Sequence, residues 1–178
     1  MKKEVFKIAL LGPESTGKST LAADLASHYQ TLWCPEFARS FLPTLNKPYT
    51  KSDVLHCVDE QQKLESDVLN TATQPLVFFD TEMINLFVWL DYCYGDAPIS
   101  LISNLKDRYD FYLLTSPDIP FEPDPLREHP DLRDYFFECY KTEVIKTGIP
   151  FTVIDGIGTT RFENAVRAVD HALKKHTE

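Results

Sequence analysis

Eight residues near the amino terminus read Gly12-Pro13-Glu14-Ser15-Thr16-Gly17-Lys18-Ser19 and match the pattern G-x-x-x-x-G-K-[ST] at every fixed position. The apolar run Val5–Leu11 precedes them, and Lys18–Tyr29, a segment of helical character, follows. A buried strand, a glycine-rich turn and a helix, in this order, are the context in which the pattern forms a phosphate-binding loop. The sequence therefore predicts a strand, a loop and a helix that together hold the phosphates of a nucleotide.

The fixed residues of this loop each supply a group that phosphate binding needs. Gly12 and Gly17 can adopt backbone angles that other residues avoid, so successive N–H groups can point inward at phosphate oxygens. Lys18 can reach the β- and γ-phosphates, and Ser19 offers a hydroxyl to Mg²⁺. We therefore predict that the nucleotide contacts Gly12, Glu14, Ser15, Thr16, Gly17, Lys18, Ser19 and Thr20.

The loop by itself does not choose between ATP and GTP. A GTPase usually carries an N-K-x-D segment that reads the guanine base. The segment Asn46-Lys47-Pro48-Tyr49 lacks the aspartate and comes too early in the chain. We therefore favour ATP with Mg²⁺, and a GTPase-like switch is an alternative.

The rest of the sequence alternates apolar runs of strand length with longer segments of helical character. Most of the apolar runs are continuous, as expected where both faces of a parallel sheet are covered. The alternating order implies right-handed crossovers between parallel strands. The sequence thus predicts a three-layer α/β/α fold of the P-loop NTPase type with a five-stranded parallel sheet. The expected strands are Val5–Leu11, Thr31–Cys34, Leu76–Phe79, Phe111–Thr115 and Phe151–Ile154, and the expected helices are Lys18–Tyr29, Ser52–Asn70, Ile84–Tyr94, Leu132–Lys146 and Arg161–Lys175.

The segment Pro117–Pro130 departs from this alternation because it holds five of the twelve prolines of the chain. Such a density of proline excludes a helix or a central strand. The segment follows the fourth strand and so lies at the carboxyl end of the sheet, where open α/β folds bind ligands. We interpret residues 117–133 as a proline-rich lid; the alternative is a passive surface loop.

Length and composition limit the class of protein. The 178 residues fit one domain, residues 1–178, and 43% hydrophobic residues exclude a disordered chain. A net charge of −9 argues against nucleic acid or an anionic membrane as the partner, while the oligomeric state is left open. The longest run without a charge, Leu25–Pro35, has 11 residues, well below the roughly 20 that span a bilayer. We interpret the four widely spaced cysteines as buried, reduced thiols and find no signal peptide after Met1-Lys2-Lys3-Glu4, so we expect a cytoplasmic protein.

Two carboxylates are expected beside the loop, at the carboxyl edge of the sheet. Val77-Phe78-Phe79-Asp80 is an apolar strand that ends in an acid, the form in which Asp80 orients Mg²⁺. Glu36 and Arg39 follow the second strand, and Glu36 is a candidate to accept the proton of a hydroxyl that attacks the γ-phosphate. The alternatives are a helix cap at Asp80 or Thr81, and a solvated turn in which Glu36 and Arg39 pair weakly.

Arg127 and Trp89 complete the candidate site residues. Arg127 lies in the proline-rich segment, and an arginine beside the transferred phosphoryl group stabilises its developing charge. Arg133 begins a helix and is equally well explained as a surface charge. Trp89 belongs to an aromatic segment with Tyr92 and Tyr94, where a pyridinium or a nucleobase can stack. Packing in an apolar core is the alternative for this segment.

Several segments together resemble the NadR-type ribosylnicotinamide kinase domain. They are Gly12–Leu21, Pro35–Arg39, Phe79–Thr81, Tyr109–Leu114 and Pro117–Pro120. The resemblance extends from about Phe6 to about Arg167, so it covers nearly the whole chain. The Pro-Glu-Phe-Ala-Arg and Pro-Asp-Ile-Pro segments are its more specific marks, because the phosphate loop is shared with many NTPases.

The resemblance implies a P-loop kinase that transfers the γ-phosphate of ATP to the 5′-hydroxyl of nicotinamide riboside and forms nicotinamide mononucleotide. It implies that Lys18 and Ser19 contact phosphate and Mg²⁺, and that Asp80 is the acid at the strand end. Glu36 then lies on the acceptor side, and Arg127 is a lid arginine. We assign catalysis to Lys18, Glu36, Asp80 and Arg127, acceptor binding to Glu36, Arg39, Asp80 and Trp89, and metal binding to Ser19 and Asp80.

Two features differ from the family pattern. Glu82 stands two residues after Asp80, where a shorter acid is expected. The sequence begins at the kinase strand, without a preceding helix-turn-helix or an H-x-G-H adenylyltransferase motif, so we expect kinase chemistry alone. The alternatives are an ATP-binding regulatory protein with slow or no turnover, and a kinase for another nucleoside or small metabolite.

Overall fold

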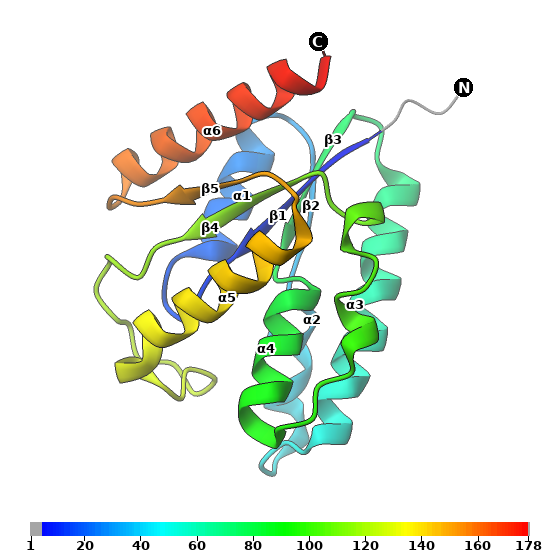
Figure 1. Cartoon of the computed structure of the whole chain (residues 1–178), viewed down its shortest axis with the longest axis vertical. Coiled ribbons are helices and arrows are strands. Elements are labelled where there is room, and N and C mark those ends of the chain that lie inside the picture. Colours follow the sequence, from blue (N-terminus) through cyan, green and yellow to red (C-terminus); the bar gives the residue numbers. More distant parts are fainter. Residues whose placement is uncertain (1–4, 178) are drawn as a thin grey trace.

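The computed structural model describes residues 5–177, and within this range helices cover both sides of one sheet (Figure 1). The segment Met1-Lys2-Lys3-Glu4, used above to argue against a signal peptide, lies outside the described residues. The strands are β1 (Phe6–Leu11), β2 (Leu32–Cys34), β3 (Leu76–Asp80), β4 (Phe111–Thr115) and β5 (Phe151–Ile154). The α-helices are α1 (Lys18–His28), α2 (Phe37–Phe41), α3 (Lys51–Thr71), α4 (Met83–Tyr94), α5 (Arg133–Thr147) and α6 (Thr159–Thr177).

The sheet is parallel throughout and has the strand order β2-β3-β1-β4-β5. The predicted five-stranded parallel sheet is therefore confirmed. Strand β1 lies at its centre and pairs with β3 on one side and β4 on the other. After β1 the chain forms β2 and β3 on one side of it, and it later forms β4 and β5 on the other side. This reversal places a ligand crevice at the carboxyl end of β1, where the phosphate loop begins.

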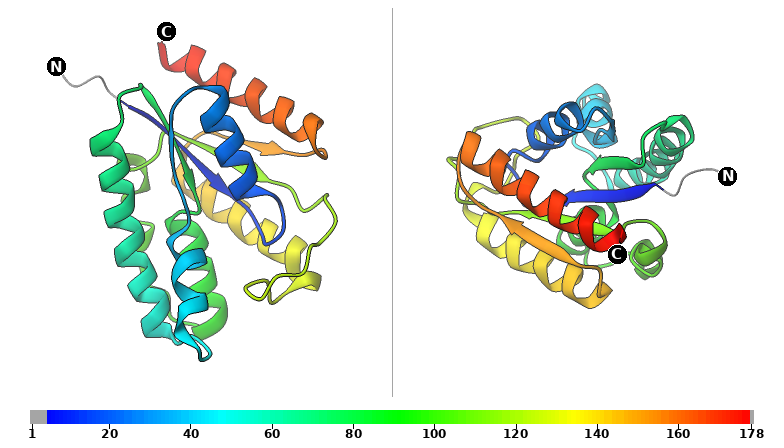
Figure 2. Two further views of the ribbon diagram at one scale, coloured as in Figure 1. Left: turned by 180° about the vertical axis from the view of Figure 1, so that it is seen from behind. Right: turned by 90° about the horizontal axis from the view of Figure 1, so that it is seen from above.

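Two apolar layers cover the sheet because successive residues of β1 point to opposite faces. Ile8 and Leu10 pack with α1 and α6, whereas Ala9 and Leu11 pack with the layer of α3, α4 and α5. In Figure 1, α5 lies in front of the sheet and α1 behind it, and the view from above in Figure 2 separates the two layers. The continuous apolar runs seen in the sequence follow from this burial on both faces.

The predicted elements end within two residues of the observed ones, and one helix was missed. Helix α2 has five residues and lies between Glu36 and the short 3₁₀-helix η1 (Leu42–Leu45). A single turn of helix is too short to show an apolar period in the sequence. Phe37 and Phe41, one turn apart, stack with ring centroids at 5.6 Å and hold α2 against α3 through His56.

The cysteines and the helices test two further expectations. All four cysteines lie in the described part of the chain and are free; Cys34 and Cys57 are buried, as predicted. The prediction of buried thiols is wrong for Cys93 and Cys139, because Cys93 lies in the exposed last turn of α4 and Cys139 is only half-buried on α5. No helix between residues 5 and 177 combines the length and the apolar character needed to cross a membrane.

Candidate active site

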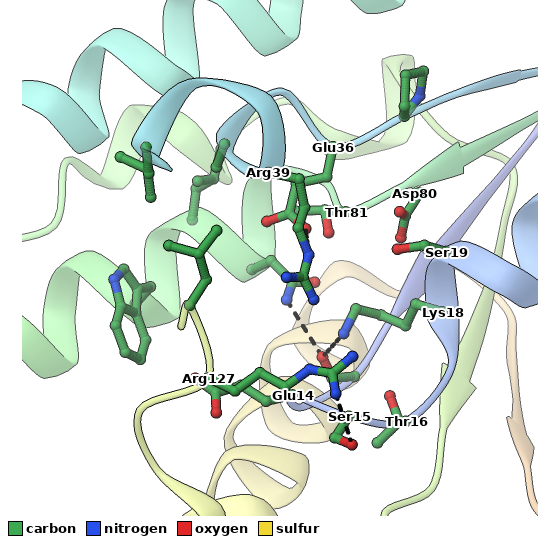
Figure 3. Close-up of a pocket in the computed structure, with 18 of the residues that line it drawn as sticks. Glu14, Ser15, Thr16, Lys18, Ser19, Glu36, Arg39, Asp80, Thr81 and Arg127 are labelled. Atoms are coloured by element: carbon green, nitrogen blue, oxygen red, sulfur yellow. Dashed lines mark hydrogen bonds and ion pairs between the residues drawn. The ribbon is translucent and has the colours of Figure 1, made fainter. Parts of the chain in front are cut away.

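A cavity of about 410 Å³ opens where β1, β2 and β3 end at the carboxyl edge of the sheet. The phosphate loop forms its floor, α2 and α4 form two walls, and the proline-rich segment closes another side (Figure 3). All residues predicted for the site line this cavity, namely Gly12, Glu14, Ser15, Thr16, Gly17, Lys18, Ser19, Thr20, Glu36, Arg39, Asp80, Trp89 and Arg127. The fold thus brings together residues that are more than one hundred positions apart in the sequence.

The phosphate loop has the backbone that an anion site needs. Gly12 has φ of 149° and Gly17 has φ of 76°, and a Cβ at Gly12 would overlap the side chain and carbonyl of Thr115. Ser15 also adopts a left-handed conformation, with φ of 54°. Helix α1 begins directly at Lys18, so the free N–H groups of its first turn lie at the cavity. Such a helix start attracts phosphate through its free donors and its partial positive charge.

Lys18 is folded onto the loop itself. Its ammonium donates to the carbonyl oxygens of Gly12 and Pro13, both at 2.8 Å. Burial lowers the pKa of Lys18, although the nearby carboxylates of Asp80 and Glu36 act in the opposite direction. The Lys18 ammonium is therefore held beside the loop, where a phosphate chain bound to the loop would contact it.

Ser19 and Asp80 form an oxygen-rich corner of the cavity, with their side chains pointing toward each other (Figure 3). Asp80 ends β3 and is 1% exposed. Its Oδ1 is buried and has no hydrogen-bond partner among the described residues. Burial raises the pKa of Asp80, and the Ser19 hydroxyl and the Lys18 ammonium partly offset this rise. An orphaned carboxylate oxygen beside a hydroxyl is the donor set that Mg²⁺ takes, with phosphate and water oxygens completing the shell.

Glu36 and Arg39 face the loop from the start of α2. Burial raises the pKa of Glu36, and the charge of Asp80 adds to the rise. Arg39 donates from Nη1 to Oδ1 of Asp124 at 2.8 Å, while its Nε lies 4.0 Å from Glu36. A solvated turn does not describe this pair, because Glu36 lies in the cavity wall and the stronger partner of Arg39 belongs to the proline-rich segment.

Trp89 lies at the cavity wall and also packs in an aromatic cluster. Its indole lines the cavity, and it also packs in an aromatic cluster with Tyr92, His129 and Phe136 at centroid distances between 5.6 and 6.0 Å. Tyr49, which the sequence analysis missed as a site residue, lines the same part of the cavity. Its position after Asn46-Lys47-Pro48 gave no signal, because the segment was read only as a failed base-recognition motif.

The proline-rich segment is bound to the phosphate loop at several points. The Glu14 carboxylate accepts from the N–H groups of Glu128 and His129, at 3.1 and 3.3 Å. The Ser15 hydroxyl accepts from the N–H of Glu122 at 2.8 Å. Glu14 and Ser15, which occupy variable positions of the motif, thus bind the proline-rich segment to the phosphate loop. The interpretation of this segment as a passive surface loop does not fit these contacts.

Three arginines approach the phosphate loop, and one of them, Arg127, for which the sequence predicts a catalytic role, lines the cavity. Arg127 reaches the Ser15 hydroxyl at 3.4 Å and the carbonyl of Glu122. Arg133 is not a surface charge, since its guanidinium donates to the carbonyls of Ser15 and Ile119 at 2.9 to 3.2 Å.

Arg161 was not predicted at all. It is 5% exposed and donates to the carbonyls of Thr16 and Ile154 at 3.3 and 3.2 Å, and it pairs with Asp118. Burial lowers the pKa of Arg161. An arginine near the start of a predicted helix carries no sequence signal for this role, because its partners are mostly backbone carbonyls from distant segments.

Glu82 does not join the cavity lining. It is the N-cap of α4, is fully buried, and accepts from the N–H of Ile84 at 2.9 Å and the hydroxyl of Tyr112 at 3.4 Å. Neither Asp80 nor Thr81 caps this helix, contrary to the alternative considered for Asp80. Burial raises the pKa of Glu82 to about 8. Glu82 therefore forms structural hydrogen bonds with α4 and with Tyr112 of β4, and it does not line the cavity.

A second cavity, of about 740 Å³, lies on the other side of the phosphate loop. It shares Ser15, Gly17, Thr20 and Arg127 with the first cavity, and its lining mixes apolar with polar and charged residues. The apolar lining comes from Leu21, Ile119, Pro120, Ile157 and Phe162. The loop therefore stands between two spaces, each large enough to hold a ring system.

Comparison with known proteins places the chain in a family and a fold. The sequence pattern of a family described as "AAA domain" matches residues 7–161. A search of curated protein sequences finds no match to this chain. Among solved structures, NadR protein in complex with NR superposes with a TM-score of 0.79 at 23% identity, over 94% of this chain and 51% of that one.

Two further structures show the same fold. NadR protein in complex with NAD and AMP-PNP gives a TM-score of 0.75 at 22% identity, over 94% of this chain and 49% of that chain. Deoxyadenosine kinase from M. mycoides with bound dATP gives 0.56 at 15% identity, over 93% and 99% of the two chains. This chain thus spans about half of the length of the two NadR chains, and the predicted resemblance to the NadR-type domain is confirmed at the level of the fold.

Proposed function

The chain belongs to the AAA domain family, and we propose that it is an ATP-dependent kinase that phosphorylates the 5′-hydroxyl of nicotinamide riboside to nicotinamide mononucleotide. The observation that carries this proposal is the position of Glu36, which faces Lys18 and Asp80 across one cavity. A phosphate loop alone suits any NTPase. A carboxylate that faces the loop from a separate element suits transfer of the phosphoryl group to a hydroxyl.

The two cavities suggest where the donor lies. The triphosphate follows the loop from Gly12 to Thr20, and the nucleoside end of ATP occupies the second cavity, where Leu21, Ile119 and Phe162 can contact its base. Ser19 and Asp80 would hold Mg²⁺, which neutralises phosphate charge when it is bound. Lys18 exchanges the carbonyls of Gly12 and Pro13, which it now contacts at 2.8 Å, for phosphate oxygens.

In the proposed step the 5′-oxygen of the acceptor forms a bond to the γ-phosphorus, and the bond from that phosphorus to the bridging oxygen of ADP breaks. The hydroxyl proton goes to the Glu36 carboxylate. Lys18 and Arg127 stabilise the negative charge that spreads over the γ-phosphoryl oxygens. Glu36 must be ionised to accept the proton, so the rate should rise with pH through its raised pKa.

The acceptor end of the cavity suits a flat cation. Trp89 and Tyr49 line it, and the Tyr49 hydroxyl donates to the carboxylate of Glu128 at 2.7 Å. Aromatic faces and carboxylates attract a positively charged pyridinium ring. One of the NadR structures with this fold holds NR, which supports the same acceptor here. We further propose that residues 1–178 act as one domain and that residues 117–133 are its lid.

The test is to incubate the protein with Mg-ATP and an acceptor and to identify the product by mass spectrometry. The acceptors are nicotinamide riboside, its analogue nicotinic acid riboside, which is a zwitterion of zero net charge at neutral pH, deoxyadenosine and shikimate. We expect nicotinamide mononucleotide as the main product. If a different acceptor alone is phosphorylated, the choice of substrate is wrong and the kinase assignment stands.

The regulatory alternative predicts a different pattern. Such a protein binds ATP, as titration calorimetry would show, yet phosphorylates no acceptor and hydrolyses ATP slowly. Lys18→Ala should weaken ATP binding under either proposal, because it removes a cation from the phosphate site. Tight ATP binding together with the absence of any phosphorylated product would therefore favour regulation over catalysis.

A further inference from the structure

Gln61 is a buried amide in the middle of α3, with an exposure of 2%. Its Oε1 accepts from the N–H of Phe37 at 2.8 Å. Its Nε2 donates to the carbonyl of Pro35 at 3.3 Å and to Sγ of Cys34 at 3.5 Å. One side chain from α3 therefore binds the peptide groups on both sides of Glu36.

The start of α2 needs such a partner. Glu36 is the N-cap of α2, but its own side chain makes no capping hydrogen bond within the described structure. Helices leave their first N–H groups unsatisfied, and the N-cap side chain normally accepts from one of them. Here the oxygen of Gln61 accepts from the N–H of Phe37, the first residue of the helix, one position before the N–H groups that an N-cap side chain normally takes.

The consequence concerns the Glu36 carboxylate. Gln61 binds the peptide groups on both sides of Glu36, and the Glu36 carboxylate makes no capping bond and lies in the wall of the cavity with Asp80 and Thr81 (Figure 3). The bond to the carbonyl of Pro35 fixes the peptide on the other side, at a proline that has no N–H of its own.

We propose that Gln61 is a positioning residue, which caps the first N–H of α2, holds the Pro35 carbonyl, and thereby keeps the Glu36 carboxylate pointed into the cavity. The inference rests on the proposed function for the use that is made of this carboxylate. The geometry of the cap is independent of that function and can be tested separately.

The first measurement is hydrogen exchange at the Phe37 amide in the full chain. Gln61→Met keeps the length of the side chain and removes both hydrogen-bonding groups, so exchange at Phe37 should become at least about tenfold faster. The matched control is Gln62→Met, because Gln62 is the next residue of α3 and donates to Sδ of Met83 at 3.6 Å. Exchange at Phe37 should not change in this control.

The second measurement is a double-mutant cycle on turnover. Gln61→Met should lower kcat about tenfold to a hundredfold, as a misplaced catalytic group does, and change the KM for ATP less than about twofold. In the Glu36→Gln background the same substitution should change kcat less than about twofold, since a positioning residue loses its effect when the group it positions is gone.

The outcomes separate the inference from the proposed function. Equal losses of kcat in both backgrounds, or unchanged exchange at Phe37, would overturn the positioning role. If the wild-type protein phosphorylates no acceptor, the proposed function fails, and exchange at Phe37 then decides the capping role alone. Should Gln61→Met not fold, Gln61→Asn replaces it, because its shorter side chain stays polar but falls short of Phe37.

Discussion

The starts of α2 and α4 carry the same residue in the same place, with opposite consequences. Glu36 and Glu82 are both N-caps of helices that follow neighbouring strands, and both have an extended backbone. Glu82 caps its own helix through the N–H of Ile84 and is fully buried. Glu36 makes no such bond and lines the cavity, while Gln61 binds the first N–H of α2. Whether the carboxylate folds back onto its own helix, rather than the residue type, therefore decides which of the two acids lines the cavity.

The surroundings of the two acids extend this difference. Behind Glu82, the buried carboxylate of Glu65 is bound by Arg108 at 2.6 Å and by the hydroxyl of Tyr109 at 2.9 Å. Beside Glu36, the buried Oδ1 of Asp80 has no partner in the described structure. Burial raises the pKa of Glu36, Asp80, Glu65 and Glu82 alike. A raised pKa therefore does not identify the site; an unsatisfied oxygen at a cavity does.

The largest expected effect is on turnover. Glu36→Gln should lower kcat by about 10²- to 10⁴-fold, because it removes the group proposed to accept the proton. Glu82→Gln should leave kcat within about threefold of the wild type, since Glu82 lies outside the cavity. Steady-state assays with Mg-ATP and nicotinamide riboside measure both. ATP binding by calorimetry, unchanged in each variant, is the control, and full turnover in Glu36→Gln would remove the distinction between the two acids.

The next effect is on the pH dependence of stability. Glu82 has a folded-state pKa of about 8 and an ordinary value near 4.5 when unfolded, so the folded state binds the extra proton between these values. Its contribution is complete below about pH 4.5 and is lost as the pH rises through about 8. Between pH 5 and pH 8, the wild type should lose roughly 2 to 4 kcal/mol more unfolding free energy than Glu82→Gln.

Urea unfolding at several pH values measures this difference. Glu138→Gln is the matched control, because the Glu138 side chain is 66% exposed on α5. The control should follow the wild-type curve. Parallel curves for wild type and Glu82→Gln would mean that Glu82 is ionised in the folded protein at neutral pH.

A smaller effect separates the two caps directly. At pH 5, Glu82→Ala should lower the unfolding free energy by about 1 to 3 kcal/mol, because it removes a cap and leaves the hydroxyl of Tyr112 without its partner. Glu36→Ala should change it by less than about 0.5 kcal/mol, since the Glu36 side chain makes no capping bond and Gln61 still binds the N–H of Phe37. Thermal unfolding of both variants tests the pair, and equal losses would contradict the assignment of the caps.

The sequence allowed the fold and the floor of the site to be predicted, because both depend on local patterns. Continuous apolar runs located the strands, and the fixed spacing of Gly12, Gly17 and Lys18 located the loop. The carboxyl edge of a parallel sheet then brought Glu36 and Asp80 beside it. These inferences required no knowledge of distant contacts.

The supporting residues could not be predicted for the opposite reason. Gln61 binds backbone groups 24 and 26 positions away, and Arg161 binds carbonyls as far as 45 and 145 positions away. Backbone carbonyls and N–H groups are the same in every residue, so such partners leave no mark in the sequence. Helix α2 was missed because one turn has no period, and with it the fact that Glu36 is an N-cap.

The smallest expected effect concerns the ion pair that links the acceptor side to the proposed lid. The guanidinium of Arg39 contacts Asp124 at 2.8 Å and lies 4.0 Å from Glu36. Both members of the Arg39–Asp124 pair are about one-third exposed, at 36% and 30%, so the pair should contribute less than about 1 kcal/mol. In Asp124→Asn, Arg39 is left with Glu36 as its carboxylate partner, which should lower the pKa of Glu36 and move the acid limb of kcat/KM to lower pH.

The pH profile of kcat/KM at low and high salt measures this shift. It should be present at low salt and shrink at high salt, because an exposed pair is screened. Asp131→Asn, at an exposed position of η4 (Pro130–Leu132), is the control and should leave the profile unchanged. The hydrogen bonds of Glu82 with Ile84 and Tyr112 are buried, so the stability difference between wild type and Glu82→Gln should not depend on salt in this way. A profile of Asp124→Asn that equals the wild type at low salt would mean that Arg39 does not act on the pKa of Glu36, which burial, Asp80, Lys18 and Thr81 would then determine.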